Sequence, residues 1–332
     1  MGFRMRKSFK IAPGVRMSVS PRGVGVSGGV KGARISAHSS GRVTRTLGVP
    51  GTGISHTSTL ASGRRPAAPR AATAPAPSAP SPGLFAPRWE KDLHKALVKK
   101  PDDLPALVAV GRDHPQARPL AQLFEALRGA VPAGDLERAR DLVAQAYAAD
   151  LDPASDPFVT KYLPGVTATL EVADGVSAQL PLDHDTVGLL LAELHQRAGD
   201  QRAAIAVVEE LTPSTVAAVS LAELYAELEE WQQVIDLTES LTNVDEAATF
   251  LLVQRGVALR EQGFPTAARE AFKEALRVRS RPAELRHRAW LERGATYLAE
   301  GKNSLARKDL ERVLAENSAY PGLQEALTKL PS

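Results

Sequence analysis

Apolar and small residues return at helical spacing in four successive copies between residues 185 and 314. The third copy shows the pattern well: Gly256 precedes a turn at Gly263, and Ala268 and Phe272 follow it. Apolar residues three or four positions apart predict amphipathic helices, and glycine predicts the turn between two of them. The pattern therefore predicts a stack of helical hairpins, because one such pair cannot bury its apolar face alone.

The four copies differ in length and in their turn residue. They begin at Asp185, Thr215, Thr249 and His287, which are 30, 34 and 38 residues apart. The second copy has Glu229 where the others have a turn glycine. We therefore expect an array of irregular curvature.

A change of period ahead of these copies predicts a β-hairpin at 165–183. Apolar and polar residues alternate from Val166 to Leu182, as in a strand with one buried face. A two-residue loop at 174–175 would mix the faces, whereas a three-residue loop at 173–175 pairs Val166 with Leu182 and makes one face wholly apolar. We expect the three-residue loop.

Residues 89–164 are predicted to be helical. Trp89, Leu93 and Leu97 form an apolar stripe that Pro101 ends. Further on, residues 120–149 contain a Gly-Asp turn followed by alanine, as in the later copies. This stretch is a possible degenerate repeat.

The first sixty residues show a strand-like pattern instead of a helical one. Gly14, Gly23, Gly32 and Gly41 lie nine residues apart, and short alternating segments follow the first three. Alternation bounded by glycine and proline predicts short strands joined by tight turns. We expect a small β-meander of four to six strands in residues 1–60. Residues 61–88, rich in Ala and Pro, are expected to be a disordered linker because they lack apolar surface to bury.

Charge divides the chain sharply. The net charge is +3, yet no acidic residue precedes Glu90, and residues 1–88 hold fourteen Lys or Arg. The remaining chain has 27 basic and all 38 acidic residues, a net charge of −11. A basic arm on an acidic body predicts an intramolecular contact between the arm and the acidic repeats, because a tether raises the effective concentration of one part near the other.

Ten basic residues in the first sixty positions form a candidate basic patch. They are Arg4, Arg6, Lys7, Lys10, Arg16, Arg22, Lys31, Arg34, Arg42 and Arg45. Such a patch could neutralise the phosphates of nucleic acid or lie on an anionic surface. Only Phe3 and Phe9 could stack on bases, so the composition favours a solvated strand face whose charges protect the sheet edges.

The sequence gives no support to catalysis. The absence of cysteine excludes disulfides, thiolate nucleophiles and cysteine-based zinc sites. The histidines are scattered, and none lies at metal-ligand spacing from another: His38, His56, His94, His114, His184, His195 and His287. We expect no catalytic residues, no metal site and no cofactor, and so no enzyme. No apolar run approaches the ~20 residues that span a bilayer, so we expect a cytoplasmic protein.

The ends of the N-terminal module carry a specific resemblance. The opening segment 1–16, MGFRMRKSFKIAPGVR, and the closing segment 47–55, LGVPGTGIS, resemble those of the bacterial DUF4236 family. The resemblance covers residues 1–60 and implies a domain boundary and a β-rich module. It implies no chemistry.

The helical copies resemble tetratricopeptide repeats. Trp290, Gly294, Tyr297, Gly301 and Ala306 follow the family pattern well. In that family the first helix of each repeat lines a concave groove that binds peptides or another protein. Carried over by position, the resemblance implies these groove residues: Glu193, Gln196, Arg197, Glu223, Glu227, Arg260, Glu261 and Arg288. They imply a mixed-charge, mainly acidic groove for a basic or polar segment.

Together these patterns predict an α+β multidomain chain. Its parts are a DUF4236-like β module (1–60), a linker (61–88), a helical region (89–164), an inserted β-hairpin (165–183) and helical repeats (184–320). We expect a scaffold that binds a protein or peptide partner, with the basic module as a second docking element. The alternative is nucleic-acid or anionic-surface binding through that module, with the repeats recruiting partners.

Overall fold

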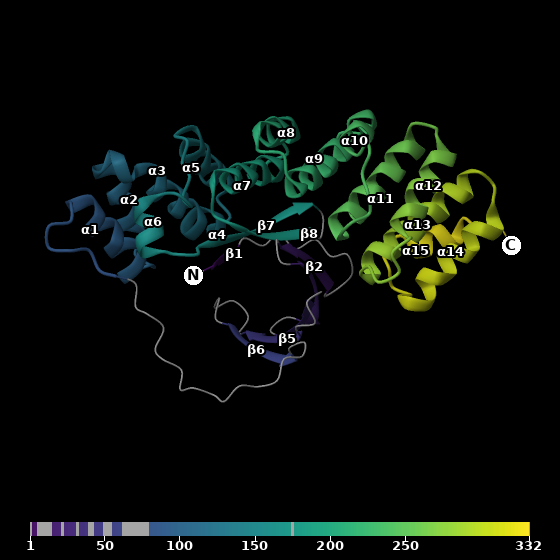
Figure 1. Ribbon diagram of the computed structural model, residues 1–332, viewed down its shortest axis with the longest axis horizontal. Helices are drawn as coiled ribbons and strands as arrows, with labels where there is room; N and C mark the ends of the chain where they lie inside the picture. The colour runs from purple at the N-terminus through teal and green to yellow at the C-terminus, as the bar shows by residue number, and fades with distance from the viewer. Residues whose placement is uncertain are drawn as a thin grey trace. The chain divides into compact units, whose positions relative to one another are not determined.

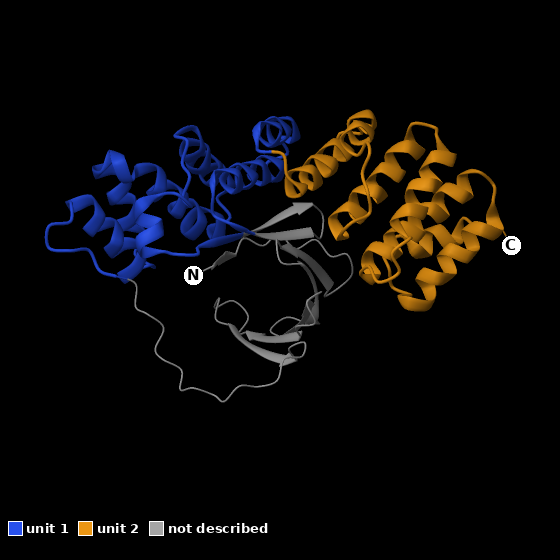
Figure 2. Ribbon diagram, viewed as in Figure 1, with its two compact units in different colours: residues 1–7, 64–171, 178–212 blue, residues 8–63, 172–177, 213–332 orange. Residues whose placement is uncertain are grey.

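A computed structural model describes the chain apart from residues 1, 5–14, 21–22, 31–32, 39–42, 49–54, 62–79, 174–175 and 332, and describes side chains for 80–168 and 180–331. The chain divides into two compact units (Figure 2). Unit 1 comprises residues 1–7, 64–171 and 178–212, and unit 2 comprises residues 8–63, 172–177 and 213–332.

Unit 1 is mainly helical. In chain order its helices are α1 (Arg88–His94), a π-helical turn (Lys95–Lys99), α2 (Leu104–Asp113), a 3-10 turn (Pro115–Ala117), α3 (Arg118–Glu125), a second π-helical turn (Ala126–Ala130), α4 (Val131–Ala133), α5 (Leu136–Ala148), α6 (Pro157–Tyr162), α7 (His184–Arg197) and α8 (Gln201–Glu210). Leu93 and Leu97 are fully buried, as the apolar stripe of the first helix predicts.

The hairpin strands lie where the alternation changes. They are β7 (Thr167–Ala173) and β8 (Val176–Pro181). The Leu182 amide donates to the Val166 carbonyl at 3.3 Å, and Val166, Ala168 and Leu182 are all buried. This end of the predicted register is present. Ala173, which the prediction places in the loop, is the last residue of β7, and residues 174–175 lie outside the described part of the chain.

The described strands of the N-terminal segment follow one another along the chain. They are β1 (Gly2–Arg4), β2 (Val15–Ser20), β3 (Gly23–Val30), β4 (Ala33–His38), β5 (Val43–Gly48) and β6 (Ser55–Ala61). Strands β2 to β6 pair antiparallel with their sequence neighbours, whereas β1 pairs parallel with β7. Strands β2, β3 and β4 coincide with the alternating segments that follow the first three of the spaced glycines.

Unit 2 contains the helical hairpins of the C-terminal half (Figure 1). The helices are α9 (Thr215–Glu227), α10 (Trp231–Leu237), α11 (Glu246–Glu261), α12 (Pro265–Ala275), α13 (Ala283–Ala299), α14 (Asn303–Glu316) and α15 (Leu323–Thr328). Helices α9, α11 and α13 are the first helices of the predicted second, third and fourth copies. Helices α10, α12 and α14 are the second helices.

One turn joins the two helices of every hairpin. Its central residue has a positive φ in all five places: Gly134, Gly199, Glu229, Gly263 and Gly301. The amide of the next residue donates to a carbonyl five positions back, as in Phe264 to Leu259 at 2.8 Å and Lys302 to Tyr297 at 2.8 Å. This pattern satisfies carbonyls that a helix end otherwise leaves unbonded. The stretch 120–149, predicted as a candidate degenerate repeat, contains the same turn at Gly134.

The second helix of each hairpin packs through a small residue five positions after the turn. These residues are fully buried: Ala139, Ala204, Val234, Ala268 and Ala306. The first helix contributes a close approach of its own. A Cβ added to Gly256 would lie 2.4 Å from Cε1 of Phe272, a ring that is itself fully buried. The turn and the crossing together fix how the two helices meet.

In the described part of the chain, every helix is too short or too polar to span a bilayer.

Replacing Glu229 by glycine should stabilise the protein by about 1 kcal/mol, because left-handed backbone costs a residue with a Cβ roughly that amount. Urea unfolding followed by tryptophan fluorescence measures the change. Gly263→Ala is the matched reverse variant: no atom lies within 4 Å of the added Cβ, so it should destabilise through the backbone alone. A Glu229→Gly variant no more stable than wild type would contradict the role of the turn.

Replacing Gly256 by alanine should destabilise the protein by about 1–3 kcal/mol, because the added methyl group overlaps the Phe272 ring. Gly294→Ala is the control, since its Cβ would lie 3.1 Å from the more adaptable Leu310 side chain. Thermal or urea unfolding of both variants should give the larger loss at Gly256. Equal losses would show that the close crossing is not the cause.

Candidate binding face of the first helices

Polar side chains connect the first helices of unit 2 to one another. Gln254 on α11 donates from Nε2 to Glu223 Oε2 on α9 at 2.9 Å. Its Oε1 accepts from Arg288 Nη2 on α13 at 3.5 Å. Three helices are thereby linked through one glutamine that is only 3% exposed.

A second link joins α11 to α13 farther along the helices. Arg260 Nη1 donates to Glu292 Oε2 at 2.8 Å and to the Glu292 carbonyl at 3.3 Å. Arg260 Nε also donates to the neighbouring Glu261 at 2.9 Å. Burial opposes the positive charge of Arg260, but the two carboxylates outweigh it and raise the pKa of the guanidinium. We call Glu223, Gln254, Arg260, Glu292 and Arg288 the polar ladder.

One residue of the ladder, Arg288, packs on an aromatic side chain. The guanidinium of Arg288 lies 5.2 Å from the ring centroid of Phe250 on α11, a distance typical of a cation–π contact. Phe250 is 2% exposed. Arg288 is therefore oriented from two sides, by this ring and by Gln254.

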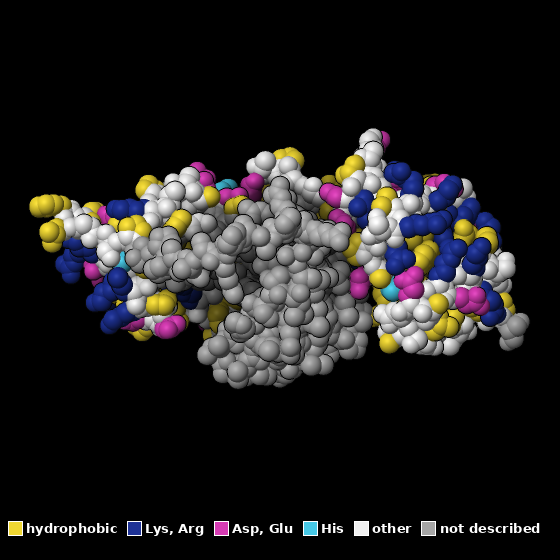
Figure 3. Space-filling view, turned by 60° about the horizontal axis from the view of Figure 1, so that its bottom comes forward, with side chains coloured by type: hydrophobic (Ala, Val, Ile, Leu, Met, Phe, Trp, Pro, Cys, Tyr) yellow, Lys and Arg dark blue, Asp and Glu magenta, His cyan; other side chains and the backbone are white. Residues whose placement is uncertain are grey.

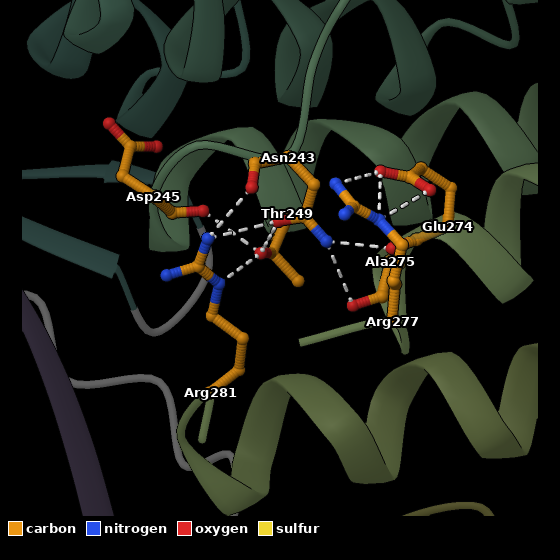
Figure 4. A network of polar contacts seen from close by, with 7 residues as sticks. All are labelled: Asn243, Asp245, Thr249, Glu274, Ala275, Arg277 and Arg281. Carbon is orange, nitrogen blue, oxygen red and sulfur yellow. Dashed lines mark hydrogen bonds and ion pairs between the residues drawn. The ribbon is translucent and has the colours of Figure 1, made fainter. Parts of the chain in front are cut away.

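Loops at the helix ends are fastened by a separate buried network (Figure 4). Asn243 Nδ2 donates to the carbonyls of Glu274 and Ala275 at 2.7 and 3.3 Å, which closes the end of α12. Asn243 Oδ1 accepts from Thr249 Oγ1 at 2.6 Å and from Arg281 Nη2 at 3.1 Å. Asn243 and Thr249 are almost fully buried. The loop before α11 and the loop before α13 are thus bonded together, which holds two ladder helices in register.

The predicted groove residues fall on both units. Glu193, Gln196 and Arg197 lie on α7 of unit 1, where Glu193 is buried with Arg197 Nη1 at 3.8 Å. The other five, on α9, α11 and α13 of unit 2, are Glu223, Glu227, Arg260, Glu261 and Arg288. Within unit 2 the structure brings Arg260 against Glu261 and links Glu223 to Arg288 through Gln254.

Three residues of this face were missed by sequence reasoning: Phe250, Gln254 and Glu292. A usable signal exists, because each lies about one repeat from a named residue. Glu223 precedes Gln254 by 31 positions, and Arg260 precedes Glu292 by 32. The side chains of the predicted basic patch in residues 1–60 lie outside those that the structure describes, so that site stays a prediction.

A hollow of about 740 Å³ lies within unit 1 among α2, α3 and α5. Its polar lining is bonded internally: Arg138 Nε donates to Glu125 at 3.0 Å, and Gln122 donates to Gln145 at 2.6 Å. Among the described residues, no group of three acidic or histidine side chains could hold a metal ion. We assign no chemistry to the hollow.

Comparison with known proteins supports the resemblance of the N-terminal segment. Residues 3–57 match the family described as "Protein of unknown function (DUF4236)". No functionally curated protein matches the chain. The resemblance of the N-terminal segment to this family is confirmed.

Solved structures resemble the helical part. The N-terminal domain of the EccA1 ATPase from the ESX-1 secretion system of Mycobacterium tuberculosis is 18% identical, with 73% of this chain and 88% of that chain covered and a TM-score of 0.47. MamA is 16% identical, with 61% and 92% covered and a TM-score of 0.38. A tetratricopeptide repeat protein from Parabacteroides merdae is 15% identical, with 73% and 98% covered and a TM-score of 0.33. The last of these belongs to the family that the helical copies resemble in sequence.

Stability should depend on pH through His195, which is partly buried, and His94, which is buried. Burial lowers the pKa of His195 on α7, with nearby Arg140 adding to the effect and Asp200 opposing it. Burial likewise lowers the pKa of His94 on α1. The unfolded chain then binds protons more readily than the folded one, so the free energy of unfolding should fall as pH drops below the ordinary histidine value of 6.5.

His195→Phe should reduce this fall, and urea unfolding at several pH values between about 7 and 5 measures it. His195→Gln is the second variant, because it removes the titrating group without supplying an aromatic ring. Both should have a shallower pH dependence than wild type. Slopes identical to wild type in both would rule out His195 as a source.

Proposed function

We propose that the chain is a non-catalytic scaffold that binds a protein or peptide segment along the face formed by α9, α11 and α13. The observation that carries the proposal is the polar ladder. It places linked charged and amide groups on three successive first helices. A partner laid across these helices would meet all three.

The ladder suits binding because its groups are held in place before a partner arrives. The side chains of Arg260 and Glu292 are 21% and 24% exposed, and that of Glu261 is 41% exposed. These groups keep some access to solvent while their mutual bonds restrict their rotamers. Ordering side chains on binding costs affinity, and preorganised groups avoid much of that cost. Groups of both signs favour a polar segment that carries charges of both signs over an apolar one.

The wider organisation is part of the same proposal. We place the scaffold in residues 184–320, with 89–164 and the hairpin at 165–183 ahead of it, and the β module at 1–60 joined by the linker at 61–88. The basic module serves as a second docking element, and the protein acts in the cytoplasm. Nucleic-acid or anionic-surface binding by the module, and its contact with the acidic repeats, remain predictions that rest on the uneven charge of the sequence.

Affinity capture from the protein's own cells tests the binding face. The intact chain should recover a protein partner, and Arg260→Ala with Arg288→Ala should lower that recovery at least about tenfold, since two charged contacts are lost together. The matched control is Lys273→Ala with Lys329→Ala, which removes two positive charges at side chains that are 69% and 63% exposed.

The control should recover the same partner at wild-type level, and circular dichroism should show equal helix content in all three proteins. Equal recovery by the ladder variant and wild type would overturn the proposed face. Equal loss in the ladder variant and the control would attribute binding to net charge instead.

A further inference from the structure

Two large apolar side chains stand in solvent immediately ahead of the helical part of unit 1. Leu84 is 90% exposed and Phe85 is fully exposed, the highest values among the described large apolar residues. They lie in an ordered turn, in which the Ala86 amide donates to the Gly83 carbonyl at 3.1 Å. Lys91 Nζ on α1 donates to the Leu84 carbonyl at 2.6 Å and fastens the turn to the helix.

Single exposed apolar residues are common on protein surfaces. An adjacent pair held outward by a turn is a different case, because the turn keeps both side chains away from the core. Such a pair is available to an apolar phase outside the protein.

The helix that follows presents a positive stripe. Arg88, Lys91, Lys95 and Lys99 are all exposed and follow one another at intervals of three or four residues. This spacing places them along one side of α1 and the π-helical turn after it. The opposite side packs into the unit, where Leu93, Ala96 and Leu97 are buried.

The acidic residues of α1 offset the stripe only in part, because Asp92 forms an ion pair with Arg88, one of its four cations. Glu90 accepts from Lys161 Nζ at 2.9 Å, so a further cation offsets its charge. Asp92 lies 3.5 Å from Arg88 Nε and 3.1 Å from His114 Nε2. In Figure 3, Lys and Arg side chains gather beside hydrophobic ones on the part of unit 1 where Figure 1 places α1.

We propose that the Leu84–Phe85 turn and the positive stripe form a docking surface for an anionic lipid bilayer. Apolar side chains at the membrane boundary enter the acyl region, while flanking Lys and Arg remain with the negative headgroups. Here the apolar pair and the positive stripe adjoin, because Lys91 of the stripe is hydrogen-bonded to the Leu84 carbonyl. The protein rests on the surface through one turn and one helix, without spanning the bilayer.

Charge and shape favour lipid over other partners. Leu84 cannot stack on a base, so half of the apolar pair has no role on nucleic acid. A bilayer takes up a two-residue wedge without a shaped pocket, and the stripe matches its charge. The sequence just before the turn adds Arg64, Arg65 and Arg70 with no acidic residue.

Flotation of the intact protein with vesicles tests the proposal. Vesicles of phosphatidylcholine with about one third phosphatidylserine should carry the protein, and vesicles of phosphatidylcholine alone should not. Leu84→Ala with Phe85→Ala should lower the bound fraction about tenfold, and so should Lys91→Glu with Lys95→Glu. Matched controls are Phe264→Ala, an exposed phenylalanine of unit 2, and Lys273→Glu with Lys329→Glu.

Both controls should float like wild type. A Trp at position 85 (Phe85→Trp) should add fluorescence that brominated lipids quench, whereas Phe264→Trp should not. Failure of wild type to float overturns the proposal. Flotation that survives the Leu84 and Phe85 substitutions also overturns it and assigns lipid binding to another basic segment. If wild type binds no vesicles and the Leu84→Ala, Phe85→Ala variant no longer captures a protein that wild type captures, the apolar pair docks in a protein pocket and not in a bilayer.

Discussion

The left-handed turn inside each helical hairpin is the constraint on which the array depends. It closes the first helix and starts the second at a fixed angle, and a small buried residue always follows five positions later, as in Gly263 and Ala268. The first helix must then approach closely, which Gly256 permits against Phe272. Since the same geometry recurs from hairpin to hairpin, the first helices of unit 2 present equivalent positions to one another.

That equivalence makes the polar ladder possible. Glu223 and Gln254 lie about one repeat apart, and so do Gln254 and Arg288. Each hydrogen bond therefore joins equivalent positions on the first helices of neighbouring repeats. The Asn243 network bonds together the loops before α11 and α13, which keeps these helices in register. Bonds between charged and amide groups in a half-buried setting are stronger than those on an open surface, and they hold the face ready for a partner.

Much of the fold could be predicted from the sequence because its signals are local. Glycine at turns and small residues at crossings mark the hairpins, and even Glu229 was recognisable as a turn residue in the place of glycine. Helix ends carry weaker local signals. Helix α10 ends at Leu237 because the following loop runs to Asn243, whose bonds lie more than thirty residues away. Helix α2 lies inside the stretch 89–164 that is predicted to be helical, and Pro105 stands in its first turn, where proline is tolerated.

The sequence predicts which helices carry the candidate site, but it does not predict which of their side chains contact one another. The family pattern names Arg260 as a groove residue, but its bond to Glu292 depends on the offset between two helices, which no local signal carries.

The most direct test of the binding face is carboxyl footprinting of the intact chain with and without its captured partner. The account predicts that labelling of Glu261 and Glu292 falls on binding, while Glu270 and Glu274 on α12 are labelled as before. Protection of the α12 carboxylates with unchanged labelling of Glu261 and Glu292 would contradict it.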